Sequence, residues 1–96
     1  MKGFNALIIT PEDNVAVAVK DIPRGEKVIA SGREPLLAVD NIPYSHKVAL
    51  IRIPRGEKII KYGEIIATAG RDIQAGEWVH THNVEAEQRN EHFFWL

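Results

Sequence analysis

Apolar positions along this chain come in short runs that Gly, Pro, Asn and Asp interrupt about every ten residues. β-Branched residues are frequent in these runs, and no long window before residue 84 shows the 3.6-residue period of an amphipathic helix. Such a pattern favours short strands joined by tight turns. We predict strands at Val15–Val19, Lys27–Ile29, Val48–Ile51, Lys58–Ile60, Glu64–Ala67 and Trp78–His82.

A seven-residue turn motif repeats along the chain. Ile22–Val28 reads IPRGEKV, Ile53–Ile59 reads IPRGEKI, Ile73–Val79 is a looser copy, IQAGEWV, and Ile42–Val48 is a degenerate fourth, IPYSHKV. The copies that begin at 22 and 42 recur at 53 and 73, so one constant offset relates both pairs. We therefore infer an internal duplication. The alternative is that a common turn is simply used four times.

The same offset aligns Gly32 with Gly63 without a gap. In each turn copy we expect Pro at the second turn position, where its ring fixes φ, and Gly two places later at a positive φ. Each copy is then a turn that leads into a strand.

Two segments leave alternatives open. Glu34–Asp40 fits either a single helical turn with Pro35 near its start or a β crossover. From Val84 onward a polar stretch leads into the strongly apolar Phe93–Leu96. We expect residues 1–84 to form one domain and residues 85–96 to be a tail that docks on a partner or a second copy, or a linker to a catalytic domain. The alternative is that the tail folds back on the domain's own core.

Size and composition narrow the classes of function. A chain of 96 residues buries about 60 to 65% of its unfolded surface, which allows one modest core but no large enclosed active site. Twelve Lys and Arg are interspersed with thirteen Asp and Glu, which argues against a nucleic-acid binder, and the absence of Cys excludes disulfides and thiolate chemistry. The apolar runs are too short for a membrane helix or a signal peptide. We expect a cytoplasmic protein whose chemistry needs a partner surface.

His80 and His82 lie two residues apart in the last predicted strand. Residues at this spacing project from one face of a strand, so the two imidazoles would sit side by side. With a third ligand, for which His46 is the candidate, they could hold a transition metal, or one could act as an acid or base. The alternative is a solvated strand face without chemistry.

Two basic segments are candidates for binding an anionic substrate. Lys47 follows His46 and could receive a carboxylate or phosphate, while Lys61 and Tyr62 could bind a polyhydroxy acid as counter-charge and hydroxyl donor. Ordinary polar turns are the alternative. Glu12–Asn14 is interpreted as a turn whose side chains bond to backbone. The chain has neither a Gly-rich phosphate loop nor a nucleophile elbow, so kinase and hydrolase activities have no support.

Four motifs follow one another in the order found in a known family. They are DNVAVA at Asp13–Ala18, HKVAL at His46–Leu50, IIKYGEII at Ile59–Ile66 and AGEWVHTHNV at Ala75–Val84. In this order they resemble the N-terminal SAF (antifreeze-like) domain of altronate and galactarate dehydratases. The resemblance implies an all-β fold: a compact, irregular β-clip domain with internal pseudo-duplication and little helix. Two departures are Ser45 and Ala67, where relatives commonly have Gly.

In that family the SAF domain is fused ahead of a larger catalytic region or forms a separate small subunit, and a short chain beginning at Met1 suggests the separate form. The resemblance implies loss of water from a sugar acid. A base removes the proton α to the carboxylate, a divalent metal, typically iron(II), stabilises the enediolate, and the β-hydroxyl leaves. The implied partners are a large catalytic dehydratase subunit that shares the metal, the sugar-acid substrate and, as an open expectation, a second copy of this chain. We expect the chain to be inactive or nearly so alone.

The resemblance also implies roles for individual residues. The catalytic candidates are His46, His80 and His82, of which His80 and His82 are also the metal-ligand candidates. The substrate-binding candidates are Lys47, Lys61, Tyr62 and Asn83.

Two other functions stay open. The α subunit of (2R)-sulfolactate sulfo-lyase carries similar HKVAL and HTHN motifs and eliminates sulfite instead of water. SAF domains also occur as non-catalytic carbohydrate-binding modules, and the histidine motifs argue against that function here. The motifs do not separate substrates, because a larger subunit would hold much of the pocket.

Overall fold

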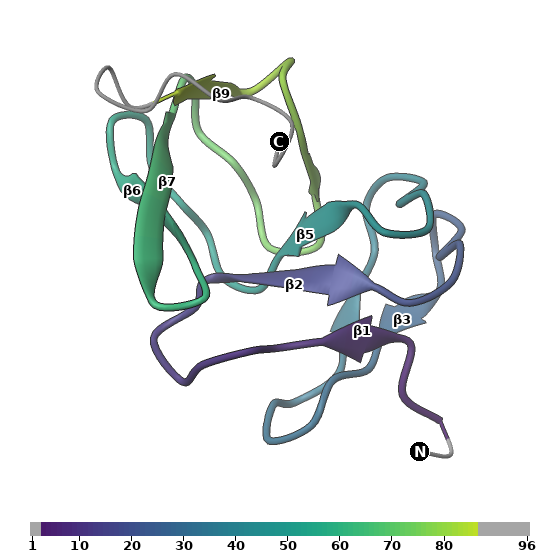
Figure 1. Cartoon of the computed structure of the whole chain (residues 1–96). Helices are drawn as coiled ribbons and strands as arrows, with labels where there is room; N and C mark the ends of the chain where they lie inside the picture. Colours follow the sequence, from purple (N-terminus) through teal and green to yellow (C-terminus); the bar gives the residue numbers. More distant parts are fainter. Residues whose placement is uncertain (1–2, 87–96) are drawn as a thin grey trace.

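The computed structural model describes residues 3–86, and within them every regular element is a strand (Figure 1). A four-stranded antiparallel sheet, ordered β1-β2-β5-β8, lies at the centre, with the pair β3-β4 and the three-stranded sheet β6-β7-β9 beside it. This confirms the all-β prediction, and residues 3–86 contain no helix long and apolar enough to span a membrane. The strands are β1 (Ala6–Leu7), β2 (Val15–Ala18), β3 (Lys27–Val28), β4 (Leu36–Leu37), β5 (Lys47–Ala49), β6 (Lys58–Lys61), β7 (Glu64–Ala69), β8 (Trp78–Val79) and β9 (Val84–Ala86).

The strand pairing confirms the internal duplication. An isolated antiparallel bridge joins Ile22 to Ile42, and a second joins Ile53 to Ile73, which are their equivalents at the offset of the turn copies. The hairpins β3–β4 and β6–β7 share a register with the same offset. The paired residues are Lys27 with Leu37 in the first hairpin and Lys58 with Thr68 in the second.

All four copies of the turn motif form the same turn, but the turn begins one residue later than we predicted. The fifth residue of each copy donates its backbone N–H to the carbonyl of the second residue, as Glu26 does to Pro23 at 3.0 Å. The second residue of the motif, which is Pro in three copies and Gln74 in the other, is therefore the first residue of the turn, and the fourth residue of the motif takes the positive φ that a type II turn requires at its third position. That residue is Gly25, Gly56 or Gly76, and in the degenerate copy it is Ser45, at φ 71°.

Two small cores stand where one was expected. Successive side chains along β2 and β5 point to opposite faces of the central sheet, so these strands contribute side chains to a core on each face. Ala16 and Val48 pack into the core of the first half, whereas Val15 and Ala49 pack into the core of the second. Short strands cannot enclose one large volume, and each half therefore buries its own isoleucines against the shared sheet. These are Ile22 and Ile42 in the first half and Ile53, Ile59, Ile66 and Ile73 in the second.

Several predicted boundaries change. Glu34–Asp40 contains a strand, β4, so the β alternative is correct there. The strand predicted at Trp78–His82 is wrong in length, because β8 ends at Val79 and the chain then turns. β9, at Val84–Ala86, is not among the predicted strands and pairs with β7. The apolar end of the predicted tail, Phe93–Leu96, lies outside the described residues, and its docking role stays a prediction.

Candidate functional site

The three candidate histidines gather around one indole ring. His80 stacks on Trp78 with ring centroids 5.5 Å apart and an angle of 8°, and His82 lies 4.9 Å from the same ring. The indole Nε1–H donates to Nδ1 of His46 at 3.1 Å, and the His46 and His80 centroids are 4.7 Å apart. We call these four residues the histidine cluster. The sequence predicted the histidines as neighbours but missed Trp78, which brings them together.

The geometry that joins His80 to His82 differs from the prediction. The two residues lie on a tight turn after β8, not on a strand face, because Asn83 folds the chain back on itself. Its Oδ1 accepts the N–H of His80 at 3.0 Å, and its Nδ2 donates to the carbonyl of Trp78 at 2.8 Å. Asn83 is 1% exposed. The structure therefore explains Asn83 as the residue that shapes this turn, and its expected role in substrate binding stays a prediction.

His80 has the least ordinary environment of the three histidines. Burial is the main reason that its pKa is lowered, and the charges of His46, Lys47 and His82 act in the same direction. Its Nδ1 is buried and finds no hydrogen-bond partner within residues 3–86. Buried ring nitrogens in structural histidines are normally satisfied, so this atom is suited to meet a ligand or a proton.

The cluster does not complete a metal site. Among the described residues no three His, Asp or Glu side chains come together in a way that could hold a metal ion. One nitrogen of His46 is already bonded to Trp78. Neutral imidazoles suit iron(II), but these residues would supply at most part of the ligand set that the family resemblance implies.

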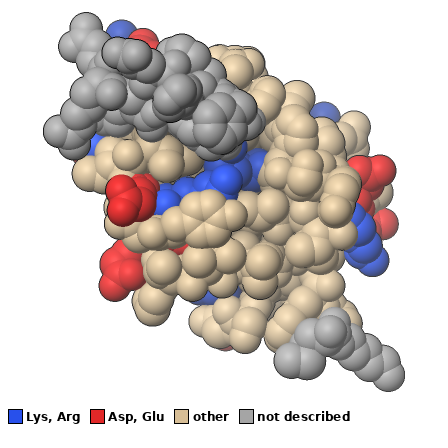
Figure 2. All heavy atoms as spheres, in the orientation of Figure 1, with Lys and Arg blue, Asp and Glu red and all other residues tan. Residues whose placement is uncertain are grey.

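Lys47 is the buried cation of the site. It lies in β5 between Val17 and Val79, and its residue is only 3% exposed. Burial lowers the pKa of its ammonium from 10.5 to about 8, and the charge of Lys61 adds to the effect. Burial is also the main cause of the lowered pKa of Lys61. Figure 2 shows Lys and Arg atoms, in blue, set back near the middle of the visible face. Because the charge of Lys61 acts on Lys47, these two lysines are taken together and called the basic recess.

Lys61 and Tyr62 belong to the tip of the β6–β7 hairpin. Tyr62 and Gly63 both have positive φ, 58° and 71°, between the paired residues Lys61 and Glu64. This is the two-residue type I′ loop that joins twisted antiparallel strands. The ammonium of Lys61 lies 4.8 Å from the centre of the Tyr62 ring.

Asp13 is hydrogen-bonded to the tip of the β6–β7 hairpin. Its Oδ1 accepts the N–H of Gly63 at 2.9 Å and the hydroxyl of Thr10 at 2.7 Å, and its Oδ2 accepts the N–H of Thr10. Burial, the largest effect, raises the pKa of this carboxyl, but the hydrogen bonds from Thr10, Gly63 and Tyr62 together outweigh it and the net pKa is lowered. The sequence indicated a turn with side-chain-to-backbone bonds here, and this is confirmed. It could not indicate that the second partner, Gly63, lies in the other part of the chain.

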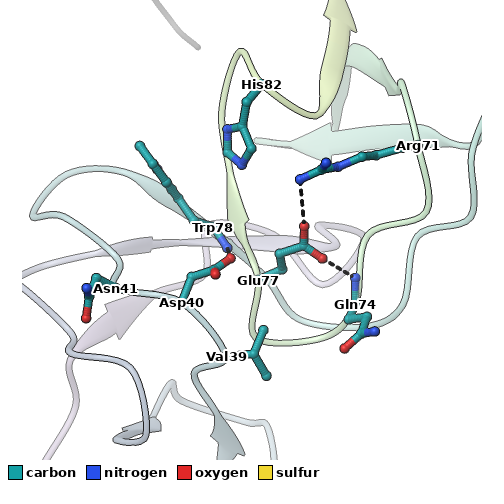
Figure 3. Close-up of a pocket in the computed structure, with 8 residues that line it drawn as sticks. All are labelled: Val39, Asp40, Asn41, Arg71, Gln74, Glu77, Trp78 and His82. Carbon is teal, nitrogen blue, oxygen red and sulfur yellow. Dashed lines mark hydrogen bonds and ion pairs between the residues drawn. The ribbon is translucent and has the colours of Figure 1, made fainter.

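Part of the histidine cluster also lines an open pocket of about 620 Å³ (Figure 3). Trp78 and His82 line it together with Arg71 and Glu77, which form an ion pair at 3.6 Å. Glu77 also accepts the N–H of Gln74 at 2.8 Å. Sequence reasoning missed Arg71 and Glu77 because nothing in the spacing of the motifs places their side chains beside His82.

The basic recess and the histidine cluster lie close enough for their charges to interact. The charge of Lys47 acts on His80, and that of Lys61 acts on Lys47, so the basic recess and the histidine cluster are electrostatic neighbours. Two recessed ammonium groups can bind a carboxylate with little competition from water. A neutral imidazole beside them can accept a proton. The arrangement can therefore bind an organic acid and assist proton transfer at a neighbouring carbon.

Comparison with known proteins finds similarity to dehydratases. Altronate dehydratase of Bacillus subtilis (strain 168) is 40% identical over 85 residues, which make up 88% of this chain and 16% of that protein. Galactarate dehydratase (L-threo-forming) of Escherichia coli (strain K12) is 43% identical over 67 residues, 70% of this chain and 12% of that protein. Altronate dehydratase of the same strain is 44% identical over 71 residues, 74% of this chain and 14% of that protein.

The chain thus spans less than a fifth of the length of these relatives. The family model described as the altronate/galactarate dehydratase SAF domain matches residues 4–87, which is most of the chain. By this match the protein belongs to the SAF domain family of altronate and galactarate dehydratases.

Proposed function

We propose that this chain is the SAF component of a sugar-acid dehydratase and that it binds the carboxylate of the substrate while a larger catalytic component completes the active site. The observation that carries the proposal is the buried ammonium of Lys47 beside Lys61 and His80. The ammonium groups of Lys47 and Lys61 act on one another electrostatically, and together they provide positive charge to which a carboxylate can bind. The relatives named for altronate and galactarate give the substrate class.

The chemistry needs stabilisation of negative charge at the carbon next to a carboxylate. A base takes the proton from that carbon, its electron pair forms a C=C bond, and the C–O bond to the β-hydroxyl breaks, releasing water once the oxygen is protonated. The enol that remains rearranges to a 2-keto-3-deoxy acid. Lys47 and Lys61 would bind the carboxylate and stabilise the charge that it gains as the proton leaves. His80, held neutral by burial, would accept or return a proton in the same site.

The larger component has two tasks in this proposal. It would supply most of the ligands of the divalent metal, which polarises the substrate when bound, because residues 3–86 do not gather a complete set. It would also cover the open side of the site, which a domain of this size cannot enclose. Both components would act together in the cytoplasm, either as separate subunits or as parts of one longer protein.

The test is reconstitution with the larger dehydratase component encoded in the same genome. Water loss from altronate and galactarate is assayed anaerobically with iron(II), with and without this chain. We expect turnover only when the chain is present, and loss of turnover when His80 is replaced by Ala or Lys47 by Met. The matched control is Lys27→Met, which removes an exposed lysine from the same place in another turn copy. Full turnover without the chain, or with Lys47→Met, would refute the proposal.

A further inference from the structure

The duplicated fold offers an internal comparison for the hairpin tip. In the first half, the side chain of Asn5 bonds to the backbone of Lys27 and Ile29, each at 2.8 Å. In the second half, Asn14 makes the same two bonds, at the same length, to Lys58 and Ile60. Asn5 and Asn14 are therefore structural equivalents, each of which holds the first strand of its hairpin.

The residue before each asparagine differs between the halves. Phe4 precedes Asn5, whereas Asp13 precedes Asn14 and reaches Gly63 at the hairpin tip. The first half therefore forms its hairpin, with Gly32 at the place of Gly63, without a carboxylate from this position. A buried carboxylate beneath the tip is not a requirement of the fold, and its presence needs another reason.

The tip of the second hairpin also contains a strained backbone conformation that the equivalent residue of the first hairpin does not have. Tyr62 has φ 58°, and among residues 3–86 only Ser45 shares a positive φ without being Gly. The equivalent of Tyr62 in the first half is Ser31, which has no positive φ. A left-handed conformation costs a bulky side chain about 1 to 2 kcal/mol. Strain of this kind persists only where surrounding contacts fix it, and it is concentrated at functional sites.

The contacts that fix Tyr62 lead back to Asp13. Asp13 is 2% exposed and accepts hydrogen bonds from Gly63 and from both donors of Thr10. The bond to Gly63 fixes the peptide that follows Tyr62. The ring of Tyr62 then lies against the ammonium of Lys61, at 4.8 Å, and the charge of Asp13 also favours the protonated form of Lys61.

We propose that Asp13 is a positioning residue, which holds the Tyr62–Gly63 turn in its strained form so that Lys61 and the hydroxyl of Tyr62 are presented together to the carboxylate and hydroxyl groups of a sugar acid. The inference rests on the proposed function for the identity of the ligand. Its structural part, the dependence of the Lys61–Tyr62 arrangement on Asp13, does not.

The first experiment needs no ligand. In the full chain, the Tyr62 ring should shift the NMR signals of the Lys61 methylene group next to the ammonium, because the ammonium nitrogen lies over the ring, 4.8 Å from its centre. We expect Asp13→Ala to abolish this shift. The matched control is Asn5→Ala, which removes the equivalent backbone contacts of the first half and should reduce thermal stability while leaving the Lys61 signals in place. Unchanged Lys61 signals in Asp13→Ala, or their equal loss in Asn5→Ala, would overturn the proposal.

The second experiment measures KM for altronate or galactarate in the reconstituted complex. We expect Asp13→Ala to raise KM about tenfold, as for loss of one charge-assisted contact, and Asn5→Ala to leave it within about twofold. In a Lys61→Ala, Tyr62→Ala background, Asp13→Ala should have almost no further effect, because its action passes through those side chains. An equal effect in both backgrounds would refute the positioning role.

The positioning role of Asp13 can be tested even if the proposed function is wrong or the first variant does not fold. If the complex turns over neither acid, the proposed function fails, and the NMR comparison still decides whether Asp13 positions the tip. If Asp13→Ala does not fold, Asp13→Asn replaces it. The Asn variant keeps one oxygen for Gly63 but turns an N–H toward another donor, so it should weaken the Lys61 shift. Unchanged Lys61 signals and KM in Asp13→Asn would overturn the proposal.

Discussion

Replacing Lys47 by methionine should make the stability of the domain less dependent on pH. The ammonium is buried, and its pKa falls from 10.5 to about 8 on folding. Since one pKa unit corresponds to 1.36 kcal/mol, burying the charged form costs the fold about 3 kcal/mol. Below about pH 8 the lysine is protonated in both states, and the full cost is present. Between about pH 8 and 10.5 the unfolded chain holds more protons than the folded one, so stability rises with pH.

The expected size of the effect follows from these two values. At pH 7 the cost is about 3 kcal/mol, and by about pH 9.5 it falls to about 1 kcal/mol. Methionine has a similar length and no charge, so Lys47→Met lacks this dependence. The difference in unfolding free energy between wild type and Lys47→Met should therefore shift by about 2 kcal/mol in favour of wild type between the two pH values. Contacts that lysine makes and methionine cannot make change this difference in unfolding free energy by a similar amount at both pH values, so they do not affect the shift.

Urea unfolding at the two pH values, followed by circular dichroism, measures the difference directly. Lys27→Met is the control, because Lys27 occupies the same place in its turn and is exposed. A difference between wild type and Lys47→Met that stays constant with pH, or moves in favour of the variant, would show that the ammonium is not buried as the structure has it.

Three further substitutions test the turns and the cluster. Ser45→Gly should stabilise the domain by about 1 kcal/mol, because Ser45 holds a left-handed φ that glycine adopts freely. Gly76→Ala, at the equivalent place in another copy, should destabilise it by at least about 2 kcal/mol, since an added Cβ would collide with the carbonyl of Leu37. Thermal unfolding of both variants checks these two values, and the opposite sign for either would contradict the shared geometry. Trp78→Phe should release His46 from the tautomer that carries its proton on Nε2, which ¹⁵N NMR of the imidazole ring detects; an unchanged tautomer would contradict the bond from the indole.

The strands and turns could be predicted from the sequence because the signals that mark them are local and occur repeatedly along the chain. Gly and Pro mark the turns, and β-branched runs mark the strands between them. The constant offset between the turn copies correctly predicted that the two halves are equivalent, and the bridges Ile22 to Ile42 and Ile53 to Ile73 follow it. The turn register was one residue out because Pro tolerates both the first and the second position of such a turn, and the hydrogen bond alone decides between them.

The site was less predictable because its properties depend on contacts between distant residues. Three of the four turn copies carry Lys at the sixth position, yet Lys27 and Lys58 are exposed and Lys47 is buried. No local pattern separates them, since Lys47 lies in β5 with β2 on one side and β8 on the other, and these neighbours come from distant parts of the chain. The period of two predicted His80 and His82 as neighbours on a strand, but the internal bonds of Asn83 replace that strand with a turn.

Comparison of the two halves separates residues that serve the fold from residues that serve the site. Positions at which the halves agree, such as Asn5 and Asn14, hold the hairpins and need no function to explain them. At three equivalent places the second half carries a costlier residue than the first: Asp13 where the first has Phe4, Lys61 where it has Ala30, and Tyr62 where it has Ser31.

All three costly replacements meet at a single hairpin tip, next to Lys47. A demand of the fold would impose such residues on both halves. The ligand proposed above, bound at one end of the pseudo-symmetric domain, would account for both their cost and their location, because its binding energy offsets burial and strain only where it makes contact.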